Sequence, residues 1–243
     1  MNKFRLLATL LVVALCTTTI FTSCRNNDDD DNGNGAFEIR ATNVINSSGR
    51  IATVRAELFS WDEVNDRERT LTTSEAPFQN NGFTLRLIDD VPSIFLYSVA
   101  ELDGAPEFTI SDRNARIASE MDLLALNSGG DEIGLFWLGS ERENEGVWAF
   151  WIYADRNVTI RGTFREECCC GRYSEDYWNV SLSNGWNTVY WQWAYNESTS
   201  TYRNITTQRP SGANLQWQFE DWSRSSRSAT TRATENRRSV FRR

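Results

Sequence analysis

The side chains that could do chemistry in this 243-residue chain are of few types. The sequence contains no histidine, and its single lysine is Lys3, close to the N-terminus. Histidine triads, histidine-ligated zinc, Schiff-base lysines and P-loop lysines are therefore excluded from the rest of the chain. The 33 acidic residues show no spacing that selects a pair for general acid–base work. We therefore expect no catalytic residues, no enzyme activity and no cofactor.

The densest group of reactive side chains is the run Glu-Glu-Cys-Cys-Cys-Gly at 166–171. Thiolates at Cys168, Cys169 and Cys170 could ligate a soft metal. Adjacent residues point in divergent directions, however, and zinc sites space their cysteines by two or more residues. We interpret this run as a loop between strands and predict no metal site. A disulfide to a partner protein and a metal held by the three cysteines are the alternatives.

Tryptophan is the other conspicuous residue type, and nine of the ten tryptophans follow residue 136. On a strand, Trp191, Trp193 and Tyr195 share one face, while Trp186 and Tyr190 share the other, because side chains alternate. One face must be buried, so the other can present aromatic rings that stack on sugar rings. The predicted glycan-binding residues are Trp178, Trp186, Tyr190 and Gln192. The alternative is that the aromatic rings fill the core.

Short alternating segments separated by turn residues would position these side chains. Residues 147–153 are apolar on both faces and predict a central strand, whereas residues 116–126 fit a strand or a short helix. With only four prolines in the chain, Gly, Asn and Asp must supply the turns. The pattern predicts an all-β fold, a β-sandwich, as two packed immunoglobulin-like subdomains over 37–128 and 129–222. One long sandwich is the alternative.

The N-terminus has the pattern of an export signal. Lys3 and Arg5 precede an uncharged apolar run, LLATLLVVALCTTTI. The run is shorter than the roughly 20 residues of a membrane span and fits a secretory h-region of about 7–15 residues. The small residues before Cys24 resemble a bacterial lipobox. The resemblance implies a lipoprotein signal peptide over 1–23, diacylglycerol on the Cys24 sulfur and acylation of the new amino terminus. A plain signal peptide with an incidental cysteine is the alternative.

Residues 24–36 predict a flexible, disordered linker. The run NNDDDDNGNG has no apolar residue, and the negative charges of its aspartates repel one another. Acidic residues soon after a lipid-bearing cysteine resemble the surface-export signal of Bacteroidetes lipoproteins. That resemblance implies exposure on the cell surface. A simple spacer is the alternative.

Charge is distributed unevenly along the chain. The formal net charge is −8, yet residues 223–243 carry seven arginines against one acid. This Ser/Thr/Arg-rich stretch predicts a disordered tail. The acidic remainder disfavours a nucleic-acid partner, which needs a basic surface. The tail is either a dispensable extension or a segment that contacts the acidic body or anionic envelope glycolipids.

Several segments resemble a group of uncharacterised Bacteroidetes cell-envelope lipoproteins with β-sandwich domains. These segments are GRIATV at 49–54, GFTL at 82–85, ISDRNA at 110–115, YADRNVTI at 153–160 and LSNGWNTVY at 182–190. The resemblance brings no catalytic residues with it. It implies an outer-membrane lipoprotein anchored in membrane lipid through Cys24. Together with the tryptophan-rich strands, this location favours a non-catalytic binding module, for polysaccharide. The alternative is a structural or adhesin-like subunit that binds envelope proteins through strand edges.

Overall fold

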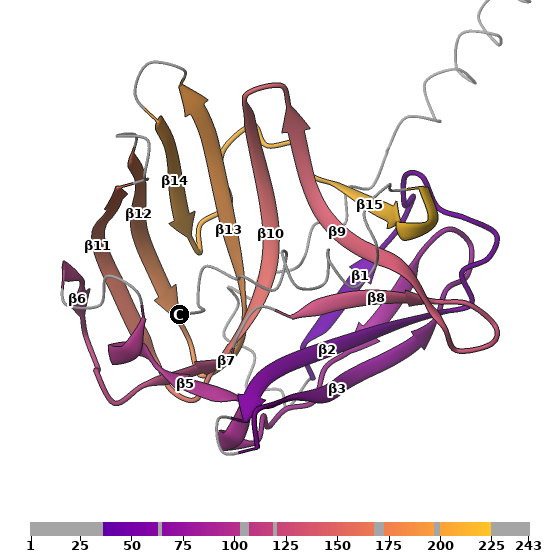
Figure 1. The fold of residues 1–243 in the computed structure, drawn as a ribbon, viewed down its shortest axis with the longest axis horizontal. Helices are drawn as coiled ribbons and strands as arrows, with labels where there is room; N and C mark the ends of the chain where they lie inside the picture. Colours follow the sequence, from indigo (N-terminus) through magenta and orange to yellow (C-terminus); the bar gives the residue numbers. More distant parts are fainter. Residues whose placement is uncertain are drawn as a thin grey trace, which may run out of the picture. The chain divides into compact units, whose positions relative to one another are not determined.

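The computed structural model describes residues 36–62, 65–102, 107–118, 121–167, 173–196 and 200–224. Within these ranges the chain forms strands, turns and short 3-10 helices, and no α-helix (Figure 1). The strands are β1 (Glu38–Ala41), β2 (Thr53–Asp62), β3 (Arg67–Pro77), β4 (Phe83–Arg86), β5 (Leu96–Ser98), β6 (Thr109–Ile110), β7 (Arg116–Ala118), β8 (Asp122–Leu126), β9 (Glu132–Arg142), β10 (Glu145–Ala154), β11 (Val158–Glu167), β12 (Tyr173–Leu182), β13 (Gly185–Asn196), β14 (Ser200–Thr206) and β15 (Gln216–Asp221). The predicted all-β sandwich is confirmed.

One continuous path connects most of the strands, in the order β3-β2-β8-β9-β10-β13-β14-β12-β11-β6. Its neighbours are antiparallel except β12 and β14, which run parallel. Off this path, β15 pairs with β9, and β7 pairs with both β10 and β5. β1 and β4 form a separate two-stranded sheet.

Strand β9 belongs to both layers of the sandwich. Along one edge its first half pairs with β8, and its second half, from Leu138 onward, pairs with β10. Its other edge pairs with β15 between Gly134 and Gly139. Because the partner changes midway, the sheet turns at β9. Figure 1 shows β2, β3 and β8 running across the direction of β10, β13 and β14.

The layer formed by β10, β13, β14, β12 and β11 is packed on both faces at one end. One face holds a cluster of buried side chains: Val99, Leu102, Phe108, Ala115, Ile117, Phe150, Ile152, Ala154, Val158, Ile160, Trp178, Val180, Leu182, Val189 and Ile205. On the opposite face, Trp151 stacks on Trp217 with ring centroids 5.7 Å apart, and Tyr153 meets Trp186 edge-on. Strand β10 therefore contributes buried side chains to both faces, which confirms the central strand predicted for residues 147–153.

Strands from the two predicted halves lie in the same sheet. The expected boundary between residues 128 and 129 falls in the turn that joins β8 to β9, and these two strands pair with each other. Strands β6 and β7 of the first half also pair with β11 and β10 of the second. Residues 116–126, which fit strand or helix by sequence, contain β7 and β8.

Asparagine supplies the tight turn between β3 and β4. Asn80 and Asn81 both have positive φ, 51° and 58°. The flanking Gln79 and Gly82 exchange both backbone hydrogen bonds, at 2.9 and 3.0 Å. Asparagine tolerates this left-handed conformation better than other residues with a Cβ, and two such residues suit a hairpin turn. The prediction that Gly, Asn and Asp supply the turns is confirmed here.

Glu57 of β2 makes the stability of the fold depend on pH. Its carboxyl is buried, 3.5 Å from the Arg55 guanidinium. Burial raises the pKa of Glu57 above its ordinary value, and the nearby charge of Arg55 only partly opposes this. A raised pKa in the folded state means that the contribution to stability is present below the unfolded value of about 4.5. It is lost as the pH rises through the folded value.

We therefore expect the free energy of unfolding of the Glu57→Gln variant to fall less than that of the wild type as the pH rises above about 4.5. Urea unfolding at a series of pH values measures this difference. Glu75→Gln is the matched control, because exposed Glu75 bonds the same Arg55 at 2.8 Å. Parallel pH curves for Glu57→Gln and wild type would contradict the assignment.

Several predicted features lie outside the described residues. They are the signal peptide over 1–23, Cys24, the linker up to residue 35, Cys168 to Cys170, and the tail from residue 225. Among the residues that the structure describes, no helix is long and apolar enough to cross a membrane.

Candidate binding groove

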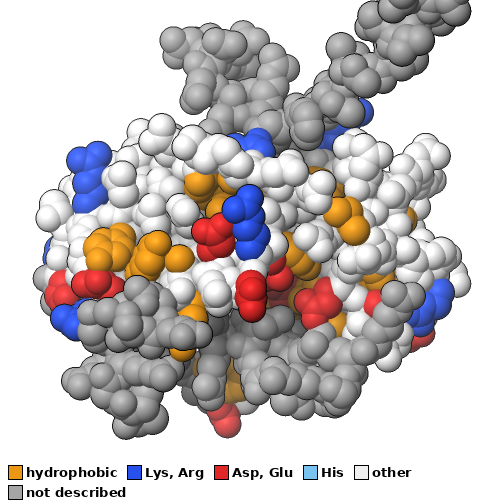
Figure 2. All heavy atoms as spheres, turned by 90° about the horizontal axis from the view of Figure 1, so that it is seen from above, with side chains coloured by type: hydrophobic (Ala, Val, Ile, Leu, Met, Phe, Trp, Pro, Cys, Tyr) orange, Lys and Arg blue, Asp and Glu red, His pale blue; other side chains and the backbone are white. Residues whose placement is uncertain are grey.

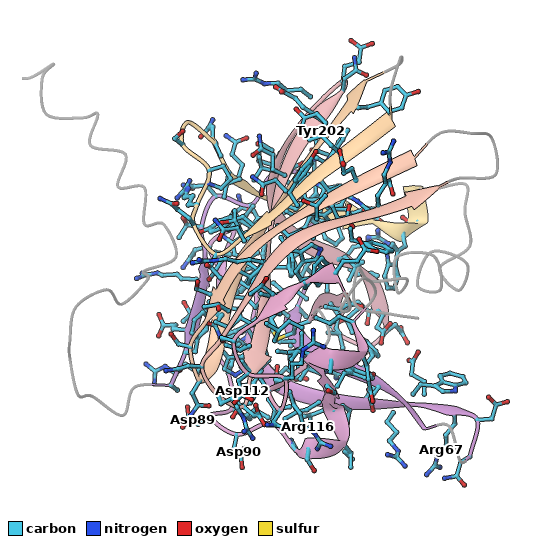
Figure 3. All side chains as sticks on the ribbon, turned by 90° about the vertical axis from the view of Figure 1, so that its left-hand side faces the viewer. Arg67, Asp89, Asp90, Asp112, Arg116 and Tyr202 are labelled. Atoms are coloured by element: carbon cyan, nitrogen blue, oxygen red, sulfur yellow. The ribbon has the colours of Figure 1, made fainter. Side chains whose placement is uncertain are left out.

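The sheet continues past its packed end toward the β9–β10 and β13–β14 connections (Figure 1). Figure 3 labels Tyr202 of β14 at this end, with Asp89 and Asp112 at the other. Successive side chains of these strands still point to opposite faces of the sheet here. Trp148 of β10 lies opposite Trp191 of β13, on the same face of the sheet as the core cluster.

A groove opens on this face next to the core cluster. Its volume is about 290 Å³, and its lining residues are Trp148, Ser174, Trp191, Trp193 and Arg203. They come from four strands, β10, β12, β13 and β14. Register explains the convergence, because Trp191 pairs with Ile205 and Trp193 pairs with Arg203 in the next strand.

The three indole rings of the groove stand at steep angles to one another. The ring of Trp148 lies 5.2 Å from that of Trp191 at 88°, and 6.5 Å from that of Trp193 at 63°. Each of the three side chains is only partly buried. Rings arranged edge-to-face leave parts of their faces free to meet a ligand, and edge-to-face packing is also a favoured geometry for aromatic pairs.

Two glycines make room for these rings. A Cβ on Gly146 would lie 2.4 Å from Nε1 of Trp193, and a Cβ on Gly139 would lie 2.7 Å from the ring of Trp148. The indoles therefore lie across bare backbone. At Gly139 the carbonyl oxygen of Val147 is also only 2.6 Å from the Cβ position, whereas at Gly146 the three nearest atoms all belong to Trp193.

Arg203 forms the polar floor of the groove. Its Nε donates to Oδ1 of Asp176, which is 4% exposed, and its Nη2 donates to Oγ of Ser174 at 3.3 Å. Its guanidinium also lies 5.8 Å from the centre of the Trp191 ring, a cation–π contact. Arg203 is thus held by a charge partner, a hydroxyl and an aromatic face.

The indole N–H groups of the groove differ in their bonding. Nε1 of Trp148 donates to Oε1 of Glu141 at 3.1 Å. Nε1 of Trp191 and of Trp193 have no hydrogen-bond partner in the described part of the chain, although both atoms are buried. Unpaired buried donors are uncommon in proteins, so a small ring movement that offered them an acceptor would be favourable.

The Gly146→Ala variant is expected to displace the Trp193 ring from the groove. The added methyl would overlap the indole, and overpacking of this kind costs about 1–3 kcal/mol. Near-ultraviolet circular dichroism should report the change in the coupled tryptophans. Gly49→Ala is the control, because a Cβ at Gly49 has nothing within 4 Å. A Gly146→Ala spectrum that superposes on the wild-type spectrum would contradict this placement.

The structure does not bring the four predicted glycan-binding residues together on an exposed surface. Trp178 is 5% exposed within the core cluster, below the groove. Trp186 is 8% exposed and donates its Nε1 to the Ile88 carbonyl at 2.8 Å. Tyr190 is 3% exposed and shares with Gln192 the sheet face opposite the groove. Three of the four predicted residues are thus buried, whereas the more open end of β13 presents Trp191 and Trp193 on the groove face.

The sequence pattern contains part of the signal for the groove. Alternation already assigns Trp191 and Trp193 to one face, as the structure has them. The missing information is which face is covered. That depends on Ile88 and on Val99, Phe108 and Ile117, which are distant in sequence. Trp148 and Arg203 join the site only through strand register, for which the sequence has no local marker.

Among the described residues no group of three or more Asp, Glu or Cys side chains is placed to hold a metal ion. Cys168, Cys169 and Cys170 lie outside those residues. No protein-family model matches the chain, and neither does any curated protein or solved structure.

Proposed function

We propose that this protein is a non-catalytic carbohydrate-binding module of the cell envelope, held at the outer membrane by lipid on Cys24. The groove lined by Trp148, Trp191 and Trp193 is the observation that carries the binding part of this proposal. The export pattern of residues 1–23 supports the location.

The chemistry of the groove suits a sugar. One face of a pyranose ring is a patch of C–H groups, which packs on an indole face. Its hydroxyl groups need donors and acceptors at the edge, and Ser174 and Arg203 provide them in the groove lining. At about 290 Å³ the groove lies just below the usual volume range of ligand sites, about 300–1,000 Å³. That size suits a short stretch of a glycan rather than a large cofactor.

The alternative role is pairing with envelope proteins through a strand edge. Strand β3, which lies at one end of the sheet, argues against this role. This strand carries Arg67, Glu68, Arg69 and Glu75, and it ends at Pro77. Charges and proline on an edge strand oppose pairing with another chain. An apolar, uninterrupted edge would instead have favoured a structural subunit.

Titration of the full chain with a panel of oligosaccharides tests the proposal, with tryptophan fluorescence and calorimetry as readouts. We expect a saturable response for at least one glycan. Trp193→Ala should weaken that binding at least tenfold, which is about 1.4 kcal/mol. Tyr202→Ala is the matched control, because Tyr202 is 46% exposed on the opposite face of the adjacent strand β14.

A flat response across the panel would contradict the glycan assignment and favour a protein partner instead. Equal weakening by Trp193→Ala and Tyr202→Ala would show that the groove is not the binding site.

A further inference from the structure

Positive and negative charge are segregated between the described domain and the segment that follows it. Residues 36–224 contain 28 acids against 16 arginines, with no lysine or histidine. Residues 225–243 contain six arginines against one acid, Glu235. The following segment therefore has a net charge of +5, against −12 for the domain. Because the two oppositely charged parts belong to one chain, their attraction raises the local concentration of the segment near the domain.

The groove end of the sheet carries acidic side chains beside exposed hydrophobic ones. Glu141, Glu143 and Glu145 lie at the β9–β10 connection and are all exposed. Exposed Arg142 lies between them and pairs with Glu145 at 3.0 Å, so three acids face one arginine and the connection keeps a net negative charge. Figure 2, which looks at the protein from above the view of Figure 1, shows acidic and basic side chains next to hydrophobic ones at this end. Such a surface attracts a ligand that is both cationic and apolar.

Guanidinium is the cation that the groove already accommodates. The Arg203 guanidinium packs on Trp191 and pairs with Asp176. Arginine stacks on aromatic faces more readily than lysine, because its charge is planar and weakly hydrated. Residues 237–243, with the sequence RRSVFRR, combine four arginines with the aromatic Phe241. This segment therefore matches both the rings and the acidic rim.

The length of the chain permits the contact. Strand β15 ends at Asp221, opposite Gly134 of β9, and the 3-10 helix η5 (Trp222–Arg224) follows. Gly139 of β9, which underlies the groove, is five residues farther along that strand, a distance of roughly 17 Å. The 19 residues of 225–243 span up to about 60 Å when extended.

We infer that the chain's own segment 225–243 occupies the tryptophan groove when no other ligand is bound, with Phe241 and its flanking arginines against the indoles. This inference stands independently of the proposed function. If the groove also binds glycans, the segment and the glycan compete for it. A second copy of the domain is a poorer occupant, because it would bring −12 against −12.

Photo-crosslinking in the full chain tests the inference without any sugar. The photoreactive residue p-benzoylphenylalanine replaces Phe241, and the crosslinked peptides are mapped by mass spectrometry in neutral detergent. We expect most intramolecular crosslinks to fall on β9, β10, β13 and β14 around the groove. Substituting all six arginines of 225–243 by glutamine should reduce their yield at least fivefold, as should 0.5 M salt, which screens exposed charges.

An arginine-to-lysine version of the same six positions is the matched control for stacking. Lysine keeps the charge and loses the planar guanidinium, so we expect a yield below that of the wild type and above that of the glutamine variant. Yields equal to wild type in both variants would overturn the inference. Crosslinks confined to other surfaces, to a second molecule, or to lipid in vesicles of anionic phospholipid would also overturn it. A negative glycan titration leaves this readout unchanged, so the two proposals fail separately.

Discussion

Replacing Trp178 with alanine is expected to lower the free energy of unfolding by about 3–5 kcal/mol. The indole is 5% exposed and its ring lies 5.4 Å from that of Phe108, inside the core cluster. Gly162, directly opposite Trp178 on β11, leaves space that Phe108 fills. Truncation would therefore leave a cavity whose walls are already fixed by close neighbours. Chemical denaturation followed by circular dichroism measures the loss.

Trp193→Ala is the informative comparison for this prediction. Trp193 is only partly buried at the edge of the groove, so its removal should destabilise the fold much less than removal of Trp178. The pair of variants separates a core tryptophan from a binding tryptophan within one sheet. Equal losses of stability would contradict the distinction between groove and core.

The second large effect is expected at Asp176. The Asp176→Ala variant leaves Arg203, whose side chain is 22% exposed, without its charge partner under the tryptophans. Removing one member of a buried ion pair costs about 3–5 kcal/mol. Because Arg203 is partly exposed, we expect the free energy of unfolding to fall by about 3 kcal/mol. Urea unfolding measures this loss, and tryptophan fluorescence reports the accompanying change in the groove.

Replacing both partners should cost less than replacing one. In the double variant Asp176→Leu with Arg203→Met, no unpaired charge remains, and apolar side chains take the place of the ion pair. We expect the double variant to recover most of the stability lost by Asp176→Ala. If the double variant is at least as unstable as the single one, the ion pair does more than neutralise two buried charges, and it stabilises the fold itself.

The sequence predicts the strands of this fold better than it predicts what covers them. Apolar residues on both faces of 147–153 suffice to place a central strand, because periodicity is local. Burial of Trp186, by contrast, depends on the Ile88 carbonyl, 98 positions away. Likewise the packing of Trp178 depends on Phe108. Alternation tells which rings share a face, and long-range packing decides which face is open.

The same limit applies to the groove. Trp191 and Trp193 are adjacent on one face by alternation alone. Arg203 meets them because β13 and β14 pair antiparallel in one particular register, and Asp176 meets Arg203 through the parallel pairing of β12 with β14. Slipping either register by one residue would place these charges on the other face. No local pattern in the sequence excludes such a slip.

The position of β15 has a consequence for the order in which the chain is made. Ile45, near the start of the described chain, donates its N–H to the carbonyl of Trp217 at 2.8 Å and accepts from the N–H of Phe219 at 3.0 Å. The other edge of β15 pairs with β9. A strand synthesised late thus lies between an early segment and the strand at which the sheet turns. A chain interrupted before residue 216 would leave the outer edge of β9 unpaired, and an open edge of this kind invites association with other strands.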